Sequence, residues 1–377
     1  MKKQIIATLG PASFDEKIVK RMTRAGADYF RINLSHTEVK DFKNIINRVR
    51  PWTDKPVCPD TEGAQLRTGK INNKSKYIEL TENQEVCFVS DHGKHKKNEI
   101  PIANFSPMKI FQIGDLVKID FDSVLIHITK ELDDNIFGKV LESGIIRSNK
   151  GIALDREVKL PCFTEKDIEI LKISNELKIE TVFLSFCSKS NDIVLLREYF
   201  DYPVNVIAKV ESKEGLLNLI DISNEADGIL IDRGDLSRDV PLEKIPFAQK
   251  KILSEVKPSG TPVYVATNLM ENMITNSKPT RAEINDIVTS LNDGSQGLVL
   301  AAETAIGKYP IECVRILSRI IHEIDSGEVK DNKYLFSLPS DRVIEPHGGK
   351  LVEQYIRKED VDSNNIPTIV INNNILA

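Results

Sequence analysis

Two carboxylates stand just beyond short apolar segments that are typical of buried strands. Glu211 follows residues 204–210, and Asp235 follows residues 228–231. Carboxylate oxygens are hard ligands, and two of them suit one Mg²⁺ whose other coordination positions are filled by substrate oxygens. We therefore expect a divalent-cation site formed by Glu211 and Asp235.

Basic residues lie near the carboxyl ends of similar segments, and one of them, Arg67, follows its segment by about a turn. They are Arg31, Arg67 and Lys209. Their charge can neutralise a phosphoryl group, and phosphoryl transfer depends mainly on positioning and charge stabilisation. The turn at Gly234 and Asp235 opens toward a helix, so its backbone amides can bind a carboxylate.

Side chains with neutral or acidic oxygens also lie near the ends of these segments. Four side chains suited to a monovalent cation are Asn33, Ser35, Asp60 and Thr61. Thr267 ends a further segment. Each of these residues taken alone is more often structural than catalytic. Matched groups recur at the same end of at least six segments, however, and this favours one active site.

The elements that must position these residues repeat one pattern, in which an apolar β-branched segment precedes a turn and a helix-period stretch. The segments are 4–8, 29–34, 56–60, 181–186, 204–210, 228–231, 262–266 and 297–300. Eight such repeats predict an α/β fold, a (β/α)₈ TIM barrel with its working residues at the carboxyl ends of the strands. An open doubly wound sheet is the alternative, but no GxGxxG follows the first strand.

Residues 61–180 interrupt the repeat. Short alternating segments at 76–80, 85–89 and 115–119 predict a small all-β domain at 70–155, inserted after the third strand of a barrel made by 1–69 and 156–325. Helical patterns cover 164–173 and 311–324. A short polar tail, 326–377, remains.

Composition argues against a nucleic-acid-binding, membrane-spanning or secreted protein. The 377 residues carry a net charge of −5, which argues against a nucleic-acid-binding surface. No apolar run is long enough to cross a bilayer, and the first residues do not form a signal peptide. The five cysteines are scattered without a CxxC pair, so reduced thiols in a cytoplasmic protein are expected.

Nine segments resemble the pyruvate kinase family, in the same order and from about residue 3 to residue 320. They are TLGPAS, RINLSH, DTEGAQLRTG, KLPCFTEKD, AKVESKEG, DGILIDRGDL, VYVATNLMENMI, KPTRAEINDI and AETAIGKYP. The resemblance implies transfer of a phosphoryl group from phosphoenolpyruvate to ADP, giving pyruvate and ATP in glycolysis.

The resemblance also implies roles for individual residues. Lys209 matches the lysine that stabilises the transferring phosphoryl group, Arg31 a phosphate contact, and Glu211 and Asp235 the ligands of Mg²⁺ or Mn²⁺. Substrate carboxylate contacts match Gly234, Asp235 and Thr267, and Thr267 also lies near the protonation path. The K⁺ site matches Asn33, Ser35, Asp60 and Thr61. Nucleotide contacts match Asn33, His36, Arg67 and, in the inserted lid, Lys150.

Several positions depart from the family. Gln65 replaces a glutamate that accompanies potassium dependence, which leaves the K⁺ requirement open. Other departures are Ala301-Ala302 for Ser-Gly, Ser188 for an arginine, Asn268 for glutamine, Asp232 for alanine, Ala153 for an asparagine and Asp155 for a proline. None of them removes Lys209, Glu211, Asp235 or Thr267.

The end of the chain suggests a second resemblance. The family's C-terminal α/β domain is not expected here, nor the allosteric control that accompanies it. Instead, residues 343–352, VIEPHGGKLV, are similar to the start of ATP sulfurylases, although a plain glycine-rich loop explains them too. The alternatives to an active pyruvate kinase are a phosphotransferase with altered substrate and a non-catalytic barrel in a sulfate-activating fusion. A homo-oligomer without nucleic-acid or membrane partners is expected.

Overall fold

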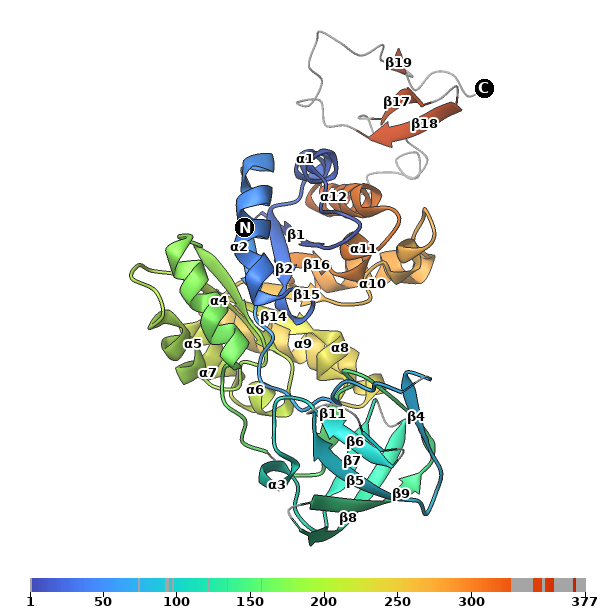
Figure 1. The fold of residues 1–377 in the computed structure, drawn as a ribbon. Helices are drawn as coiled ribbons and strands as arrows, with labels where there is room; N and C mark the ends of the chain where they lie inside the picture. Colours follow the sequence, from blue (N-terminus) through green and yellow to red (C-terminus); the bar gives the residue numbers. More distant parts are fainter. Residues whose placement is uncertain are drawn as a thin grey trace.

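The computed structural model describes residues 2–73, 75–91, 95–96, 98–120, 123–133, 135–156 and 158–326, and the backbone of 342–347, 350–355 and 369–370. Eight parallel strands close into a barrel (Figure 1). The barrel strands are β1 (Gln4–Leu9), β2 (Tyr29–Asn33), β3 (Val57–Asp60), β12 (Thr181–Leu184), β13 (Asn205–Val210), β14 (Gly228–Asp232), β15 (Val263–Ala266) and β16 (Gly297–Leu300). The eight predicted segments are these strands, so the predicted (β/α)₈ barrel is confirmed.

Two predicted strands extend too far. Leu34 begins a 3₁₀ turn, and Phe186 has φ +52°, a left-handed conformation outside the β region. Both strands therefore end earlier than their apolar runs, because the chain turns sharply at the barrel mouth.

Helices cover the outside of the barrel, and short 3₁₀ turns connect them. The helices are α1 (Glu16–Ala25), α2 (Val39–Val49), α4 (Glu165–Glu176), α5 (Ser190–Arg197), α6 (Lys213–Leu217), α7 (Leu219–Glu225), α8 (Arg233–Leu236), α9 (Ile245–Val256), α10 (Arg281–Asn292), α11 (Ala302–Ala305) and α12 (Pro310–Ser326). The 3₁₀ turns are η1 (Leu34–His36), η2 (Arg50–Trp52), η3 (Leu242–Lys244), η4 (Lys257–Ser259) and η5 (Glu271–Ile274).

Local sequence signals set the ends of these helices. Asp15 accepts hydrogen bonds from the first amides of α1, and Gly26 ends the helix with φ +113°. Thr164 and Asp167 form a reciprocal capping box at the start of α4. The predicted helices at 164–173 and 311–324 correspond to α4 and α12.

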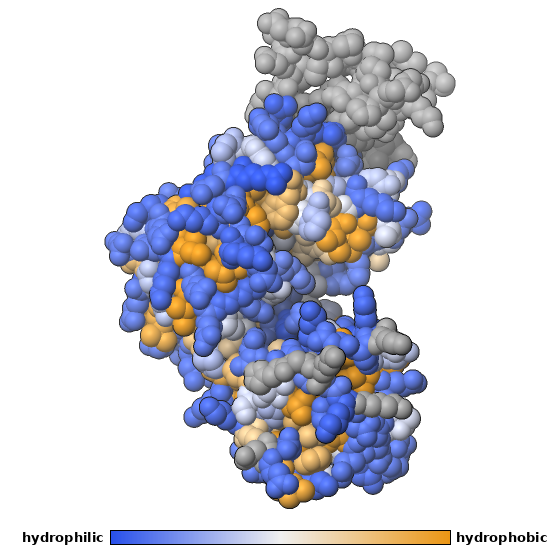
Figure 2. Space-filling view, in the orientation of Figure 1, coloured by the Kyte–Doolittle hydropathy of each residue, from blue (hydrophilic) through white to orange (hydrophobic). Residues whose placement is uncertain are grey.

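Side chains fill the barrel in two layers. One buried cluster lies between the strands and the surrounding helices, and a second occupies the barrel interior. The interior residues are Ile6, Cys58, Phe183, Ile207, Leu230, Tyr264, Ala266 and Val299. Because the interior is closed by these side chains, chemistry is confined to the mouth. Figure 2 shows that hydrophilic residues dominate the visible outer surface, with apolar residues in smaller groups.

The chain between β3 and β12 forms separate sheets at one end of the barrel (Figure 1). Their elements are β4 (Tyr77–Leu80), β5 (Glu85–Ser90), β6 (Glu99–Ile102), α3 (Pro107–Ile110), β7 (Leu116–Ile119), β8 (Val124–Leu132), β9 (Asn135–Glu142), β10 (Gly144–Arg147) and β11 (Ile152–Leu154). A six-stranded sheet has the order β11-β7-β8-β9-β5-β6, and β10 pairs with β4. These strands enclose their own apolar core. The domain limits 70–155 remain a prediction.

Two crossing segments connect this inserted part to the barrel. Thr68 donates a backbone hydrogen bond to the Lys150 carbonyl oxygen (2.8 Å), and Arg67 forms an isolated bridge with Gly151. Regular strand pairing in the barrel is sparse nearby. Phe183 and Asp60 form the one register pair recorded between β12 and β3, whereas β2 and β3 share four.

The tail contributes a small antiparallel sheet of order β18-β17-β19, formed by β17 (Arg342–His347), β18 (Lys350–Tyr355) and β19 (Ile369–Val370). The segment similar to ATP sulfurylases spans β17 and β18, except that residues 348–349 lie outside the described residues. Residues 371–377, the final INNNILA, also lie outside them. The second resemblance stays a prediction.

Burial controls the reactivity of three thiols. Cys58, Cys187 and Cys313 are buried, and burial raises the pKa of each one. A raised pKa means less thiolate at pH 8, so we expect Ellman's reagent to modify these thiols slowly in the native protein and rapidly in denaturant. The half-buried Cys87 should react before them. Modification of all three buried thiols within the mixing time would contradict this prediction.

Candidate active site

Lys209 lies at the centre of the barrel mouth. Its Nζ is 2.8 Å from Glu211 Oε1 and 3.1 Å from Asp60 Oδ1, and it donates a hydrogen bond to Ser185 Oγ (2.9 Å). Burial alone would lower the pKa of Lys209, but the two carboxylates raise it above the ordinary lysine value. The buried ammonium therefore stays charged.

Arg31 projects from β2 toward the same carboxylate. Its Nη1 lies 2.9 Å from Asp60 Oδ2, and its Nε donates a hydrogen bond to Thr8 Oγ1 (3.0 Å). Asp60 thus stands between two buried cations, Arg31 and Lys209. Nη1 is buried and makes no hydrogen bond of good geometry. Buried donors are nearly always paired, so this one has capacity for a ligand oxygen.

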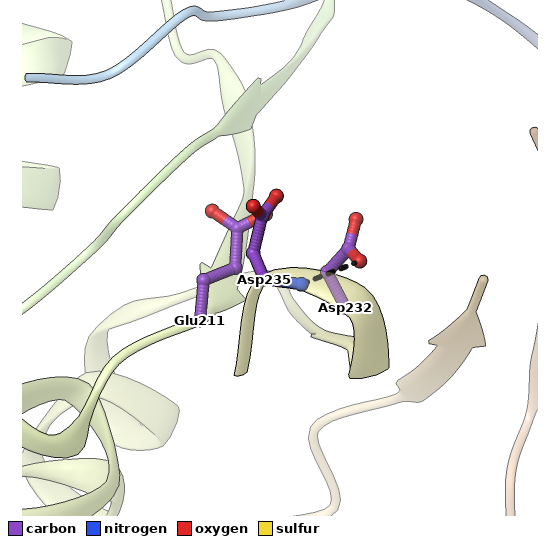
Figure 3. A group of neighbouring side chains, drawn as sticks. All are labelled: Glu211, Asp232 and Asp235. Carbon is purple, nitrogen blue, oxygen red and sulfur yellow. Dashed lines mark hydrogen bonds between the residues drawn. The ribbon is translucent and has the colours of Figure 1, made fainter. Parts of the chain in front are cut away.

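Three carboxylates gather beside Lys209. Single oxygens of Glu211, Asp232 and Asp235 all lie within 4.8 Å of one another (Figure 3). Glu211 Oε2 accepts a hydrogen bond from the Phe186 amide (2.7 Å), and Oε1 forms the ion pair with Lys209. Burial raises the pKa of Glu211, and the two neighbouring carboxylates add to the rise against the charge of Lys209.

This donor set fits the divalent cation expected from the sequence. Carboxylate oxygens are the hard ligands that Mg²⁺ and Mn²⁺ prefer. Asp235 also forms an ion pair with Arg238, whose Nη1 donates a hydrogen bond to Gln65 Oε1 (2.6 Å). A Cβ added at Gly151 would lie 3.1 Å from Arg238 Cζ, so this guanidinium spans the barrel and the inserted part.

A strained turn presents Thr267. Thr267 and Asn268 both have positive φ, +77° and +55°, which is costly for residues with a Cβ. Arg233 holds the turn, because its Nε donates to the Thr267 carbonyl oxygen (3.1 Å) while its Nη1 pairs with Asp286 Oδ2 (2.8 Å). The Thr267 hydroxyl donates a hydrogen bond to Asp232 Oδ1 (2.6 Å).

The residues predicted for a monovalent cation lie at the adjacent ends of β2 and β3. Asn33 and Asp60 are register partners, and Asn33 Oδ1 accepts a hydrogen bond from the Ser35 amide (2.9 Å). Thr61 Oγ1 accepts one from the Ser185 amide (2.9 Å). The structure therefore brings these oxygens to one side of the mouth.

The structure groups two of the predicted nucleotide residues. Arg67 Nη1 donates to the Asn149 carbonyl oxygen (3.0 Å), next to Lys150, whose Nζ pairs with Asp120 (3.0 Å). His36 lies exposed at the end of η1. Among the described residues, no recorded contact joins His36 to Arg67 or Lys150.

Sequence reasoning missed three contributors to this site. Asp232 was visible as a departure from the family, but its bond to Thr267 depends on how β14 and β15 lie side by side. The contacts of Arg238 and Arg233 carried no sequence signal, because each joins segments distant in the chain.

A buried, charged lysine beside three carboxylates at the mouth of a (β/α)₈ barrel is suited to phosphoryl transfer, the chemistry of phosphotransferases. Comparison with known proteins agrees. The family model described as "Pyruvate kinase, barrel domain" matches residues 1–314. A pyruvate kinase of Mycobacterium intracellulare is 34% identical over 333 residues, which cover 86% of this chain and 70% of that protein.

A pyruvate kinase of Thermococcus litoralis is 30% identical, over 85% of this chain and 69% of its own length. The chain belongs to the pyruvate kinase family, and its function is that of this phosphotransferase family, whose substrates are phosphoenolpyruvate and ADP and which generally depends on Mg²⁺. The family and enzyme class predicted from the sequence are confirmed. In the described part of the chain, no helix has the length and apolarity needed to cross a membrane.

Gly234 is sterically coupled to Thr267. A Cβ at Gly234 would lie 2.9 Å from Thr267 Cγ2. We expect Gly234→Ala to displace Thr267 and to lower kcat/KM for phosphoenolpyruvate about tenfold or more, since small misplacements at a reacting centre are costly. Gly260→Ala, in open space on a remote turn with φ +75°, should reduce thermal stability only. Unchanged kinetics in folded Gly234→Ala would contradict this prediction.

Proposed function

We propose that Lys209, Arg31 and Thr267 carry the transfer of a phosphoryl group from phosphoenolpyruvate to ADP. The observation that supports this assignment is the position of the Lys209 ammonium, which is buried and charged 2.8 Å from Glu211. A phosphoryl group that reaches the cation site next to Glu211 lies within reach of Lys209. The negative charge of the transferring phosphoryl group is then stabilised by an ammonium that is already in place.

Arg31 and the cation site would neutralise the negative charge of the phosphoryl group together with Lys209. Nη1 of Arg31, which pairs with Asp60 without a hydrogen bond of good geometry, would donate to a phosphoryl oxygen. Glu211 and Asp235 would hold the Mg²⁺ or Mn²⁺. When bound, the cation supplies charge neutralisation and a template for the phosphoryl oxygens.

Thr267 is proposed to lie on the path of the proton that converts the enolate into pyruvate. Its strained, Arg233-held turn fixes the hydroxyl at the mouth. The substrate carboxylate would be received by Thr267 and by the amides of Gly234 and Asp235, at the start of α8.

The nucleotide is proposed to lie between the barrel and the inserted part. Arg67 and Lys150 stand on the two crossing segments, with Asn33 and His36 on the barrel side. Closure of residues 70–155 over the nucleotide would exclude water from the transfer.

We propose that Asn33, Ser35, Asp60 and Thr61 form the K⁺ site and that the requirement for K⁺ is weak. Gln65 is neutral, and Arg238 is hydrogen-bonded to it. The guanidinium thus provides a fixed positive charge near the place where the family combines a glutamate with K⁺.

We also propose a homo-oligomer in the cytoplasm. The five cysteines are free, as expected for reduced thiols. Exposed apolar side chains on α6, η3 and α9, namely Leu217, Leu242 and Phe247, support a surface for a second copy.

The assignment of Lys209 is tested by Lys209→Met, which keeps the length of the side chain and removes its charge. We expect kcat for pyruvate formation with Mg²⁺ to fall about 10³-fold, as for loss of a main electrostatic contact. Lys213→Met, an exposed lysine four residues later, is the matched control and should keep full activity. Rapid turnover by folded Lys209→Met would reject the assignment.

The K⁺ proposal is tested by Gln65→Glu. A carboxylate there would neutralise Arg238, so the variant should depend more on K⁺ than the wild type. Initial rates would be compared in K⁺ and in tetramethylammonium salts. Gln112→Glu adds the same charge at an exposed position and should leave the K⁺ response unchanged. Equal K⁺ dependence of Gln65→Glu and the wild type would count against a role for Gln65 and Arg238.

A further inference from the structure

Three donors at the barrel mouth converge on one carboxylate oxygen. Asp232 Oδ1 accepts hydrogen bonds from the Thr267 hydroxyl (2.6 Å), the Gly234 amide (3.2 Å) and the Asp235 amide (3.5 Å). Figure 3 shows the bond to the Asp235 amide as a dashed line. These are the donors assigned above to the carboxylate of the substrate. In this structure the chain's own carboxylate engages all three.

Two carboxylates cannot share these donors at full strength. A hydroxyl has one proton to donate and each amide has one, so a second acceptor would receive weaker, divided bonds. The two negative charges would also repel each other at short range in a partly buried site. Substrate binding in the assigned orientation therefore requires Asp232 to leave Thr267 and the two amides.

Helix capping alone does not account for this arrangement. An aspartate before a helix commonly accepts bonds from the first amides, and Asp232 does so for α8. The bond to Thr267 goes further, because it joins the ends of β14 and β15. The carboxylate also lies within 4.8 Å of Glu211 and Asp235, whose negative charges repel it, while the charges of Lys209 and Arg31 attract it.

Asp232 also differs from the other two carboxylates in its partners. Glu211 pairs with Lys209, and Asp235 pairs with Arg238. No ion pair recorded among the described residues includes Asp232. Hydrogen bonds to Thr267 and to the start of α8 hold it directly, and the charges of Lys209 and Arg31 attract it without forming an ion pair. Rotation of its side chain therefore breaks no ion pair.

We propose that Asp232 is an internal carboxylate that occupies the subsite for the substrate carboxylate, so that phosphoenolpyruvate must displace it in order to bind. This inference rests on the proposed function, because that function places the substrate carboxylate there. Asp232 is then a specificity-determining residue that weakens the affinity for phosphoenolpyruvate and leaves nucleotide affinity unaffected. The family usually has alanine at this position, which leaves the same donors free for the substrate.

The test compares Asp232→Ala and Asp232→Asn with the wild type. Binding of phosphoenolpyruvate would be measured by calorimetry with Mg²⁺ and without nucleotide, together with KM for both substrates. We expect Asp232→Ala to lower Kd for phosphoenolpyruvate about tenfold or more, because it removes both competitor and repulsion. Asp232→Asn keeps the capping oxygen but loses the charge, so its Kd should fall less. KM for ADP should not change.

Asp221→Asn, which removes an exposed charge on α7, is the matched control and should bind phosphoenolpyruvate like the wild type. Unchanged or weaker binding of phosphoenolpyruvate to the folded variants would overturn the proposal. A lowered melting temperature with an unchanged Kd would show that Asp232 acts only as a helix cap. Asp232→Asn keeps the test decisive if Asp232→Ala does not fold. Absence of pyruvate formation in every protein, the wild type included, would overturn the proposed function, whereas the calorimetric Kd would still report on Asp232.

Discussion

The buried ammonium of Lys209 is the interaction on which the mouth of this barrel depends. It pairs with two carboxylates, Asp60 and Glu211, which are nearly inaccessible to water. Removing such a cation would leave uncompensated charge in a medium of low polarity, a large energetic cost. The same contacts connect the ends of β3 and β13, with Ser185 after β12 between them. One charged group thus stabilises the fold and prepares a site for phosphoryl oxygens.

Much of this architecture could be predicted from the sequence. The barrel strands are continuous apolar runs, and a run that is buried on both faces leaves a clear signal. Residues at strand ends, such as Lys209 and Glu211, come together because all parallel strands end on the same side of a barrel. The inserted sheets were also visible, since alternation at 76–80, 85–89 and 115–119 has the period of half-buried strands.

The contacts that could not be predicted depend on register and side-chain direction. Arg238 reaches Gln65 because segments far apart in the sequence cross at the mouth, and an arginine after a short helix gives no hint of such a partner. The turn with positive φ at Thr267 is held by Arg233 from another strand end. Asp232 stood out as an unusual residue, but only the adjacent placement of β14 and β15 revealed which donors it engages.

The sparse pairing between β12 and β3 has a consequence for the order of folding events. Barrel closure at this point must bring together Asp60 and Phe183, the ends of a very long excursion of the chain. The entropy lost in closing a loop grows with its length, and such distant pairings slow folding. The inserted sheets have their own core, and Thr68 pairs with Lys150 at their base. If these sheets assemble early, the chain between Asp60 and Phe183 is already compact, and less entropy is lost when the barrel closes.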